Sequence, residues 1–361
     1  MDPISAIGVI SGTSMDGIDV ALLRTDGHAV VEAGAGRTYD YKPDLRAALL
    51  ALIADPERCA NDPLDSLEDA VSDAHAGAVS QFIQDFAIDR AAVKLVGIHG
   101  QTILHRPAQR FTRQLGRGER IAKTLGIDVI YRFRHADVAA GGEGAPFAPL
   151  YHQALARRLN QPVMVLNLGG VGNVTYIDGD TILAFDTGPA SALLGDFIQR
   201  RRGLAYDANG ALAGSGRPDP ALVANLMAHP YFARPAPKSL DRNDFHAWAQ
   251  AVDGLSDADG AATFAEFTCA SVAAARALVP KPVKRWLVTG GGRHNATFMR
   301  RLSEIFAVPV EPVEAVGWHG DFIEAECFAY LAVRSQSGLP LSVPGTTGVA
   351  APMLGGELCR A

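Results

Sequence analysis

The sequence predicts a two-lobed α/β protein, because strands alternate with helices and two glycine-rich polar turns each join a pair of strands. The first turn lies in GVISGTSMDGIDVALLRT, residues 8–25, and the second in VMVLNLGGVGNVTYID, residues 163–178. A turn between neighbouring strands implies antiparallel pairing, so mixed sheets are expected. The 361 residues exceed what one ordinary core accommodates, which predicts two domains.

Composition excludes several classes of protein. Hydrophobic residues make up 48% and charged residues 20% of the chain, as in a well-packed globular protein. The net charge of −6, without a long basic run, argues against a nucleic-acid partner. The start Met1-Asp2-Pro3 has no positive charge, and no stretch approaches the ~20 apolar residues of a membrane span, so neither secretion nor membrane association is expected. Four scattered cysteines without a C-x-x-C pair are typical of reduced thiols in a cytoplasm.

The first lobe is expected over residues 1–135. Seven elements are predicted there in chain order: strands Ile7–Ser11, Ile18–Leu23 and Val30–Ala33, helices Asp44–Ala54 and Pro63–Phe86, and strands Lys94–His99 and Asp128–Phe133. The longer helix repeats apolar side chains at helical spacing, and the strand Lys94–His99 after it runs into the polar end His99-Gly100-Gln101-Thr102. Residues 340–361 are expected to pack back on this lobe.

The second lobe is expected over residues 136–339. Its predicted elements are a helix from about Pro146 after a glycine-rich loop, the hairpin Val163–Asp178, a strand ending at Asp186, a helix stopped by Gly203, a strand before Gly290-Gly291-Gly292, a helix after it, and a last helix from Asp321 to Gly338. Asp321 stands where an N-cap of that last helix is expected.

The first polar turn has the composition of a phosphate-binding loop. Glycines allow the backbone to approach a ligand, and successive N–H groups together with the Thr13 and Ser14 hydroxyls form a donor-rich concavity. A long hairpin loop with solvated side chains explains one such turn equally well. A similar polar turn recurs at Gly169, however. Asp16 and Asp19 stand at the first turn and Asn167 and Asn173 at the second, which favours two phosphate loops.

The chain lacks the lysine that many nucleotide-binding loops use. No G-x-x-x-x-G-K-[ST] segment occurs, and the Gly34-Ala35-Gly36 stretch lacks the third glycine of a dinucleotide fingerprint. A bound triphosphate would therefore need Mg²⁺, held through water by carboxylates.

Other candidate residues have simpler alternatives. Asp186 at a strand end suits a general base or metal ligand, or else a helix N-cap. Gly290-Gly291-Gly292 permits contact with adenine or ribose, although a tight strand–helix turn explains it more simply. Glu324 fits an ordinary capping box, His99 a satisfied structural histidine, and Arg200-Arg201-Arg202 a solvated helix end.

Taken together, the motifs resemble the anhydro-N-acetylmuramic acid kinase family over nearly the whole chain. The motifs, in order, are SGTSMDGIDVAL, GIHGQT with HRP, RHADVAAGGEGAP, LNLGGVGNVTYI, FDTGP, PKSLDRNDF, GGGRHN and DFIEAECFAYLA. The resemblance implies a two-lobed actin/hexokinase-like (ribonuclease H-like) fold with ATP and substrate in the interdomain cleft. It also implies a double reaction, in which water opens the anhydro bridge of 1,6-anhydro-N-acetylmuramic acid and O6 takes the γ-phosphate of ATP. The products are N-acetylmuramic acid 6-phosphate and ADP, in recycling of bacterial peptidoglycan.

The resemblance also implies roles for individual residues. Asp186 matches the family's base, which activates the water, and Glu324 matches a second carboxylate that helps to hold it. The residues expected to bind ATP are Gly12, Thr13, Ser14, Met15, Asp16, Gly17, Ile18, Asp19, Gly169, Gly170, Asn173, Gly291 and Gly292. Asp16 and Asp19 are expected to hold Mg²⁺ through water. The residues expected to bind the sugar are His99, Gln101, Asp137, Gly142 and Asn167.

Two positions depart from the family pattern, and two other functions stay open. Ser191 stands where the family usually has Asn, and Glu143 where it commonly has Gln, which adds a negative charge near a site for an anionic sugar.

An ordinary sugar kinase would use Asp186 to deprotonate a free hydroxyl. A non-catalytic actin- or Hsp70-like ATPase would need a peptide-binding domain or an assembly surface. A homodimer is expected by family analogy.

Overall fold

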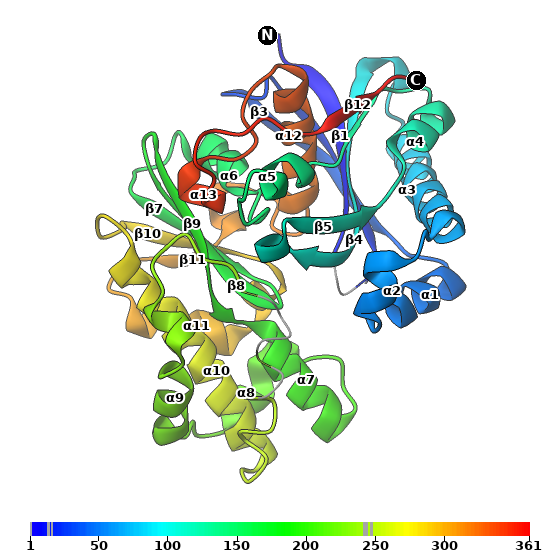
Figure 1. The fold of residues 1–361 in the computed structure, drawn as a ribbon. Coiled ribbons are helices and arrows are strands. Elements are labelled where there is room, and N and C mark those ends of the chain that lie inside the picture. Colours follow the sequence, from blue (N-terminus) through cyan, green and yellow to red (C-terminus); the bar gives the residue numbers. More distant parts are fainter. Residues whose placement is uncertain (1, 13–14, 16, 241–244, 246–247) are drawn as a thin grey trace. The chain divides into compact units, whose positions relative to one another are not determined.

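The computed structural model describes residues 2–12, 15, 17–240, 245 and 248–361, and the chain forms two compact units. The first unit comprises Met1–Leu155 and Phe322–Ala361, and the second comprises Ala156–Asp321. In Figure 1 the red C-terminal strand joins the blue and teal elements of the first unit. No helix within the described ranges is both long enough and apolar enough to cross a membrane.

The boundaries of the units differ from those expected. The first unit extends to Leu155 rather than to residue 135, and the chain returns to it at Phe322 rather than at residue 340. Buried contacts account for the difference. The Tyr151 hydroxyl donates a 2.7 Å hydrogen bond to Glu326, and the rings of Tyr151 and Tyr330 lie 5.4 Å apart. These contacts attach the last long helix to the first unit.

A mixed sheet forms the centre of the first unit. Its strand order is β12-β6-β4-β1-β2-β3, with β5 paired to β4. The strands are β1 (Ile4–Ser11), β2 (Ile18–Thr25), β3 (Val31–Tyr39), β4 (Val93–Arg106), β5 (Phe111–Leu115), β6 (Val129–Tyr131) and β12 (Glu357–Cys359). The predicted hairpin is confirmed, because β1 pairs with β2 antiparallel while it pairs with β4 parallel.

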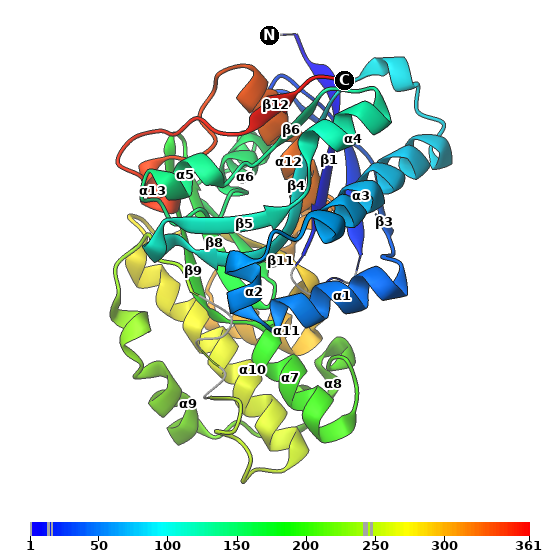
Figure 2. The same ribbon diagram turned by 45° about the vertical axis from the view of Figure 1, so that its right-hand side comes forward.

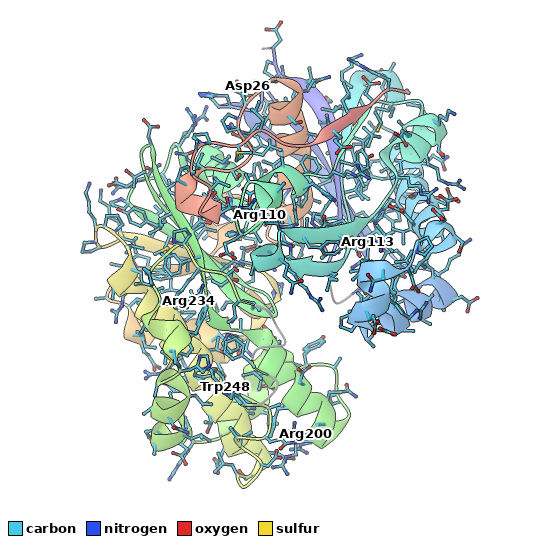
Figure 3. All side chains as sticks on the ribbon, viewed as in Figure 1. Asp26, Arg110, Arg113, Arg200, Arg234 and Trp248 are labelled. Atoms are coloured by element: carbon cyan, nitrogen blue, oxygen red, sulfur yellow. The ribbon has the colours of Figure 1, made fainter. Side chains whose placement is uncertain are left out.

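Helices cover both faces of this sheet. They are α1 (Pro43–Ile53), α2 (Pro56–Asn61), α3 (Asp65–Asp85), α4 (Gly118–Leu125), α5 (His135–Ala139), α6 (Pro149–Ala156), α12 (Ile323–Gln336) and α13 (Pro344–Thr347). Figure 2 shows α3 beside α4, which pack together, and the sequence did not predict α4. Figure 3 labels Arg113 on β5, which donates hydrogen bonds to the carbonyls of Cys59 (2.9 Å) and Pro63 (3.0 Å) and so ties β5 to the end of α2.

Two glycines allow α12 to lie directly on the sheet. A Cβ at Gly8 would lie 1.8 Å from the carbonyl oxygen of Ala325, and one at Gly97 would lie 2.1 Å from that of Phe328. Ile7 and Val9 flank Gly8 and belong to the core that includes side chains of α3. Because successive side chains of a strand point to opposite faces, α3 and α12 cover opposite faces of the sheet.

The second unit contains a five-stranded sheet of order β11-β10-β7-β8-β9. Its strands are β7 (Val163–Leu168), β8 (Val171–Asp178), β9 (Thr181–Pro189), β10 (Arg285–Thr289) and β11 (Val310–Pro312). The pairs β7–β8 and β8–β9 are antiparallel, whereas β10 pairs with its neighbours parallel. Its helices are α7 (Ser191–Arg202), α8 (Ala211–Ser215), α9 (Pro220–Met227), α10 (Asp257–Ala274) and α11 (Ala296–Ile305).

Several element ends can be compared with the sequence prediction. Gly203 ends α7 in the left-handed conformation with φ of +68°, as predicted. The strand predicted to end at His99 instead continues to Arg106, and Gly100, with φ of +80°, lies where the register with β1 shifts. The predicted N-cap at Asp321 is wrong. Phe322 occupies that position, and Asp321 instead accepts a 2.5 Å hydrogen bond from the Arg293 guanidinium.

Candidate active site

A row of polar side chains crosses the second sheet. Asn167 on β7 pairs directly with Asn173 on β8, and Asn173 pairs directly with Asp186 on β9. Directly opposed residues of antiparallel strands present their side chains on the same face of a sheet. A register shift between Gly172 and Asn173 leaves Thr187 as the extra residue of β9, which sets this alignment. The register thus gathers three residues that the sequence proposed for substrate, nucleotide and catalysis.

Asp186 is held by a second segment of the same unit. Its backbone N–H donates to the Lys238 carbonyl at 2.9 Å, and its carboxylate Oδ2 accepts the Leu240 N–H at 2.8 Å. Its carbonyl accepts a 2.6 Å hydrogen bond from the Tyr231 hydroxyl. Ala190, not Asp186, is the N-cap of α7, which removes the capping alternative. The strand end therefore fixes the position of a half-buried carboxylate.

Lys238 supplies a positive charge near this carboxylate. Its side chain is buried, and its ammonium lies 4.5 Å from the centre of the Tyr231 ring and donates to the Tyr231 carbonyl at 3.1 Å. Burial and the neighbouring Arg234 lower the pKa of Lys238, whereas the negative charge of Asp186 raises it. The Lys238 ammonium therefore lies close enough to Asp186 for their opposite charges to attract.

The second glycine turn is bonded to the start of α7. The carbonyls of Gly169 and Gly170 accept hydrogen bonds from the N–H groups of Ser191 (2.9 Å), Ala190 (3.0 Å) and Ala192 (3.2 Å). These bonds satisfy amides that a helix start leaves without partners inside the helix. Ser191, which departs from the family pattern, thus joins α7 to the second glycine turn through its backbone N–H.

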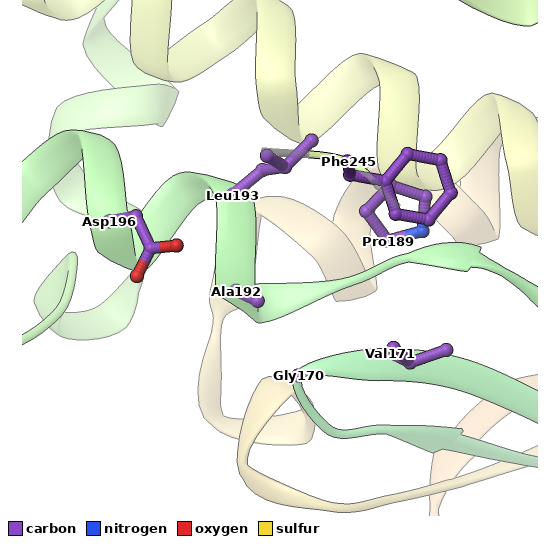
Figure 4. Close-up of a pocket in the computed structure, with 7 residues that line it drawn as sticks. All are labelled: Gly170, Val171, Pro189, Ala192, Leu193, Asp196 and Phe245. Carbon is purple, nitrogen blue, oxygen red and sulfur yellow. The ribbon is translucent and has the colours of Figure 1, made fainter. Parts of the chain in front are cut away.

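A pocket opens beside this turn (Figure 4). It encloses about 250 Å³ of empty space, part of it continuous with solvent. Its lining is mainly apolar with one carboxylate, and consists of Gly170, Val171, Pro189, Ala192, Leu193, Asp196 and Phe245. Concave, largely apolar surfaces with a few polar groups are typical of small-molecule sites.

The three consecutive glycines have different surroundings. A Cβ at Gly290, whose φ is +75°, would lie 2.3 Å from Asn167 Oδ1, and one at Gly292 would lie 2.5 Å from Leu168 Cβ. A Cβ at Gly291 would meet nothing within 4 Å. Arg293 fixes the turn by donating to the Gly290 carbonyl at 3.0 Å. Close packing therefore requires glycine at positions 290 and 292, whereas Gly291 is open to a ligand.

The described part of the first glycine loop is held by side chains from other segments. Gln101 Nε2 donates to the Gly12 carbonyl at 3.3 Å, and Arg46 Nε donates to the Met15 carbonyl at 2.9 Å. Gly17 packs against β3, where an added Cβ would lie 2.4 Å from Thr38 Cγ2. Thr13, Ser14 and Asp16 lie outside the described residues.

Two further residues of this loop belong to β2. Ile18 is buried, and Asp19 Oδ1 accepts a 2.6 Å hydrogen bond from the Thr38 hydroxyl. Gln101 is fully buried, so its contact with Gly12 makes it a support of the loop.

Glu324 lies in the first turn of α12, where no side-chain cap is formed, so it is not a capping-box residue. Although its side chain is exposed by surface area, crowding by protein atoms reduces its hydration and raises the pKa of Glu324. The negative charge of Asp19 raises this pKa further, and the positive charge of Arg134 lowers it. The first unit therefore brings both Asp19 and Arg134 within electrostatic range of Glu324.

His99 is buried and bonded at both ring nitrogens. Arg134 Nε donates to His99 Nε2 at 2.9 Å, so Nδ1 carries the proton and donates to the Gly100 carbonyl at 2.8 Å. Burial and the adjacent guanidinium lower the pKa of His99 well below its ordinary value. His99 is thus a neutral support for Arg134, which agrees with the structural alternative.

Asp137 and Gly142 make contacts within the first unit, and their expected contact with the sugar stays a prediction. Asp137 is 2% exposed, and its carboxylate accepts hydrogen bonds from Gly144 N–H (2.7 Å), the Thr347 hydroxyl (2.6 Å) and the Ser342 hydroxyl. A Cβ at Gly142 would lie 2.2 Å from Asp137 Oδ1. Both residues are buried, so their observed contacts hold the loop around Gly144.

Sequence reasoning missed three charged residues of these sites: Arg46, Arg134 and Lys238. Arg134 opens the motif RHADVAAGGEGAP and Lys238 lies in PKSLDRNDF, so the motifs contained a signal for both. Arg46 lies in a helix without a motif, and only the fold brings it to Met15. No cluster of three or more histidine, cysteine, aspartate or glutamate residues that could hold a metal occurs in the part of the chain that the structure describes.

Comparison with known proteins places the chain among relatives of one family. The sequence profile of the family described as anhydro-N-acetylmuramic acid kinase matches residues 4–360. A relative of that name from Rhodospirillum rubrum is 52% identical over 353 residues, which cover 97% of this chain and 93% of the relative. One from Acidiphilium cryptum is 52% identical over 360 residues, covering 98% of each chain.

A solved structure shows the same fold. The Acidaminococcus fermentans (R)-2-hydroxyglutaryl-CoA dehydratase component A aligns with a TM-score of 0.51 and 12% identity, over 92% of this chain and 99% of that one. This likeness concerns the fold alone, and the two mixed sheets with their helices confirm the predicted α/β class. The sequence matches over nearly the full length confirm the predicted family. The chain belongs to the anhydro-N-acetylmuramic acid kinase family.

Proposed function

We propose that this kinase opens 1,6-anhydro-N-acetylmuramic acid with water and phosphorylates the released O6, giving N-acetylmuramic acid 6-phosphate and ADP. The observation that carries the proposal is the row of Asn167, Asn173 and Asp186, in which a carboxylate anchored by Leu240 stands beside two amides. Amides bind sugar hydroxyls or phosphate oxygens, and an anchored carboxylate suits a general base.

Asp186 acts as the base in this proposal. It removes a proton from the water that attacks C1, the C1–O6 bond breaks, and the electron pair of that bond stays on O6. O6 then attacks the γ-phosphorus, and the bond between that phosphorus and the β–γ bridging oxygen breaks to release ADP. No general acid is needed, because phosphorus rather than a proton captures the leaving oxygen. Glu324 orients the attacking water.

The nucleotide is proposed to bind through the glycine turns. Gly12, Met15, Gly17, Ile18 and Asp19 of the first turn provide backbone groups for phosphate, together with Thr13, Ser14 and Asp16. Gly169, Gly170 and Asn173 form the second turn, and Gly291 offers an open surface to adenosine, with Gly292 packed behind it. The prediction that nucleotide and sugar bind in an interdomain cleft stays a prediction.

Mg²⁺ fits the charges of the first unit. Asp19 raises the pKa of Glu324, so these carboxylates repel each other, and a cation near them would relieve that repulsion. Asp19, with Asp16, would hold the ion through water. When bound, Mg²⁺ neutralises charge on the triphosphate, which positions the γ-phosphoryl group for transfer.

We also propose a cytoplasmic role in peptidoglycan recycling, by an enzyme that forms a homodimer. Cys59, Cys269, Cys327 and Cys359 are buried free thiols, as expected in a reducing compartment. The dimer rests on family analogy, and equilibrium sedimentation of the purified chain tests it.

The experiment that tests the proposed reaction offers Mg-ATP with either the anhydro sugar or N-acetylmuramic acid, in ¹⁸O-labelled water. We expect turnover of the anhydro sugar, with the label on C1 of the product before anomeric exchange and none in the transferred phosphoryl group. Phosphorylation of the free sugar alone would show an ordinary sugar kinase instead. ATP hydrolysis with neither sugar modified would favour the non-catalytic ATPase alternative.

A further inference from the structure

The guanidinium of Arg134 is fixed by neutral partners. Its Nε donates to His99 Nε2 at 2.9 Å, and its Nη1 donates to the Gly144 carbonyl at 2.5 Å. The guanidinium carbon lies 5.4 Å from the centre of the Phe147 ring. The bond between His99 Nδ1–H and the Gly100 carbonyl sets the tautomer of His99. His99 Nε2 is therefore always the acceptor for Arg134 Nε. Arg134 therefore projects from a rigid support.

This guanidinium has no counter-ion within contact distance. Arg134 is half-buried, its Nη2 makes no hydrogen bond to any residue that the structure describes, and no carboxylate among those residues lies within ion-pair distance. The carboxylates of Glu324 and Asp137 act on it only at longer range than an ion pair. Half-buried charges in proteins are ordinarily paired, because the loss of hydration is otherwise uncompensated. A fixed arginine with a vacant nitrogen matches the geometry that recognises carboxylate or phosphate.

The contacts of Arg134 distinguish it from the phosphate loops. It is bonded to Gly144, in the loop that Asp137 and His105 hold from other sides, whereas Gln101 and Arg46 hold the Gly12 loop. A ligand anion that meets Arg134 is thus expected on the sugar rather than on the triphosphate. The anhydro sugar of the proposed function carries one anionic group, the carboxylate of its lactyl ether.

We propose that Arg134 binds the lactyl carboxylate of the sugar substrate and so selects muramic over glucosamine sugars, with His99 as the positioning residue that orients it. This inference rests on the proposed function. Loss of a hydrogen bond to a charged group from a half-buried site weakens binding roughly 10–100-fold. Binding of the neutral sugar, which lacks the lactyl ether, should not be weakened.

The test compares two sugars against three variants. The ligands are 1,6-anhydro-N-acetylmuramic acid and 1,6-anhydro-N-acetylglucosamine, and binding of each is measured by calorimetry alongside turnover with Mg-ATP. Wild type is expected to bind the lactyl sugar more tightly. Arg134→Met should weaken binding of that sugar by roughly 10–100-fold and leave binding of the neutral sugar within about twofold. Arg134→Lys, which keeps the charge but loses the planar fork, should fall between.

Arg132→Met is the matched control. Arg132 is exposed and pairs with Glu357 at 3.1 Å, so its replacement two residues away should leave the preference between the sugars intact. If Arg134→Met weakened binding of both sugars equally, the inference would be overturned. Arg134 would then act only through its electrostatic interaction with Glu324. A raised KM for ATP with unchanged sugar binding would assign it to phosphate.

Failure of the inference differs from failure of the proposed function. If wild type turns over neither sugar, the proposed reaction fails, whatever the variants do. If wild type opens both sugars and binds them equally, the reaction stands and recognition of the lactyl group by Arg134 is wrong. Thermal melting of each variant identifies loss of folding, and His99→Gln offers an independent variant that should weaken lactyl-sugar binding selectively if Arg134 needs its support.

Discussion

Asp186 differs from an ordinary strand-end aspartate because its N–H, its carbonyl and one carboxylate oxygen are bonded to Lys238, Tyr231 and Leu240. Asp186→Asn retains an oxygen for the Leu240 N–H but loses basicity, so the fold and binding should persist. Since a positioned base contributes roughly 10²–10⁴-fold, kcat should fall by at least that factor. Because O6 becomes a nucleophile only after the bridge opens, cleavage and phosphorylation should be lost together.

Product analysis by mass spectrometry, with ATP and sugar binding measured by calorimetry, checks this expectation. An active Asp186→Asn enzyme would show that Asp186 is not the base. Leu240→Ala, which keeps the backbone N–H, controls for changes in the packing of that segment.

Glu143 places a negative charge next to Gly144, whose carbonyl Arg134 holds. Its backbone is fixed by Thr347 and His105, so a change of side chain should leave the loop in place. Glu143→Gln removes repulsion of an anionic sugar and should lower its KM several-fold, about the effect of one partly screened charge. Steady-state kinetics at low and high ionic strength measure it, and the neutral anhydro sugar is the control. An unchanged KM at low ionic strength would mean that the Glu143 charge does not reach the substrate.

At the scale of elements, the turn after β10 separates structural glycines from an exposed one. Gly290→Ala forces a side chain into positive φ and toward Asn167, which should destabilise the protein by about 1–3 kcal/mol. Gly291→Ala meets open space and should fold normally, yet it should raise the KM for ATP if adenosine lies on that residue. Urea unfolding and nucleotide titration of both variants test the pair. Normal ATP binding by Gly291→Ala would remove this turn from the nucleotide site.

The β1–β2 hairpin predicts a requirement for a divalent ion. No P-loop lysine is present, and Asp19 and Glu324 repel each other, so charge on the triphosphate needs a cation. Excess chelator should abolish turnover, and added Mg²⁺ should restore it. Sugar binding without nucleotide, measured in the same chelator, should persist. Full activity in chelator would contradict the prediction.

At the scale of the whole molecule, buried neutral histidines make stability depend on pH. Burial lowers the pKa of His75 to about 4 and that of His152 to about 3, and it also lowers that of His99. The unfolded chain binds these protons at an ordinary pKa near 6.5, so the contribution to stability is complete above that pH. It is lost as pH falls from 6.5 toward the folded values, at up to about 1.4 kcal/mol per pH unit for each histidine.

Urea unfolding at several pH values between 7.5 and 4.5 measures this slope. His75→Gln cannot gain the proton and should reduce the slope by about one histidine's share, while exposed His28→Gln should leave it unchanged. Identical slopes for the two variants would show that His75 does not carry the dependence.

The sequence by itself determined the features that local patterns encode. Alternating strands and helices gave the fold class, the two polar turns gave the hairpins at Gly12 and Gly169, and Gly203 ended its helix as predicted. The ordered motifs identified the family. These features depend on residues close together in the chain, where spacing and turn chemistry act directly.

The tertiary structure alone decided which distant residues meet. The bulge at Thr187 sets the register that aligns Asn167, Asn173 and Asp186, and buried pairing of Tyr151 with Glu326 places α12 in the first unit. It also buried Asp137 and left Arg134 with a vacant nitrogen. Strand register, burial and charge pairing arise from contacts between segments far apart in sequence. The free energy of those contacts cannot be deduced from the local spacing of residue types.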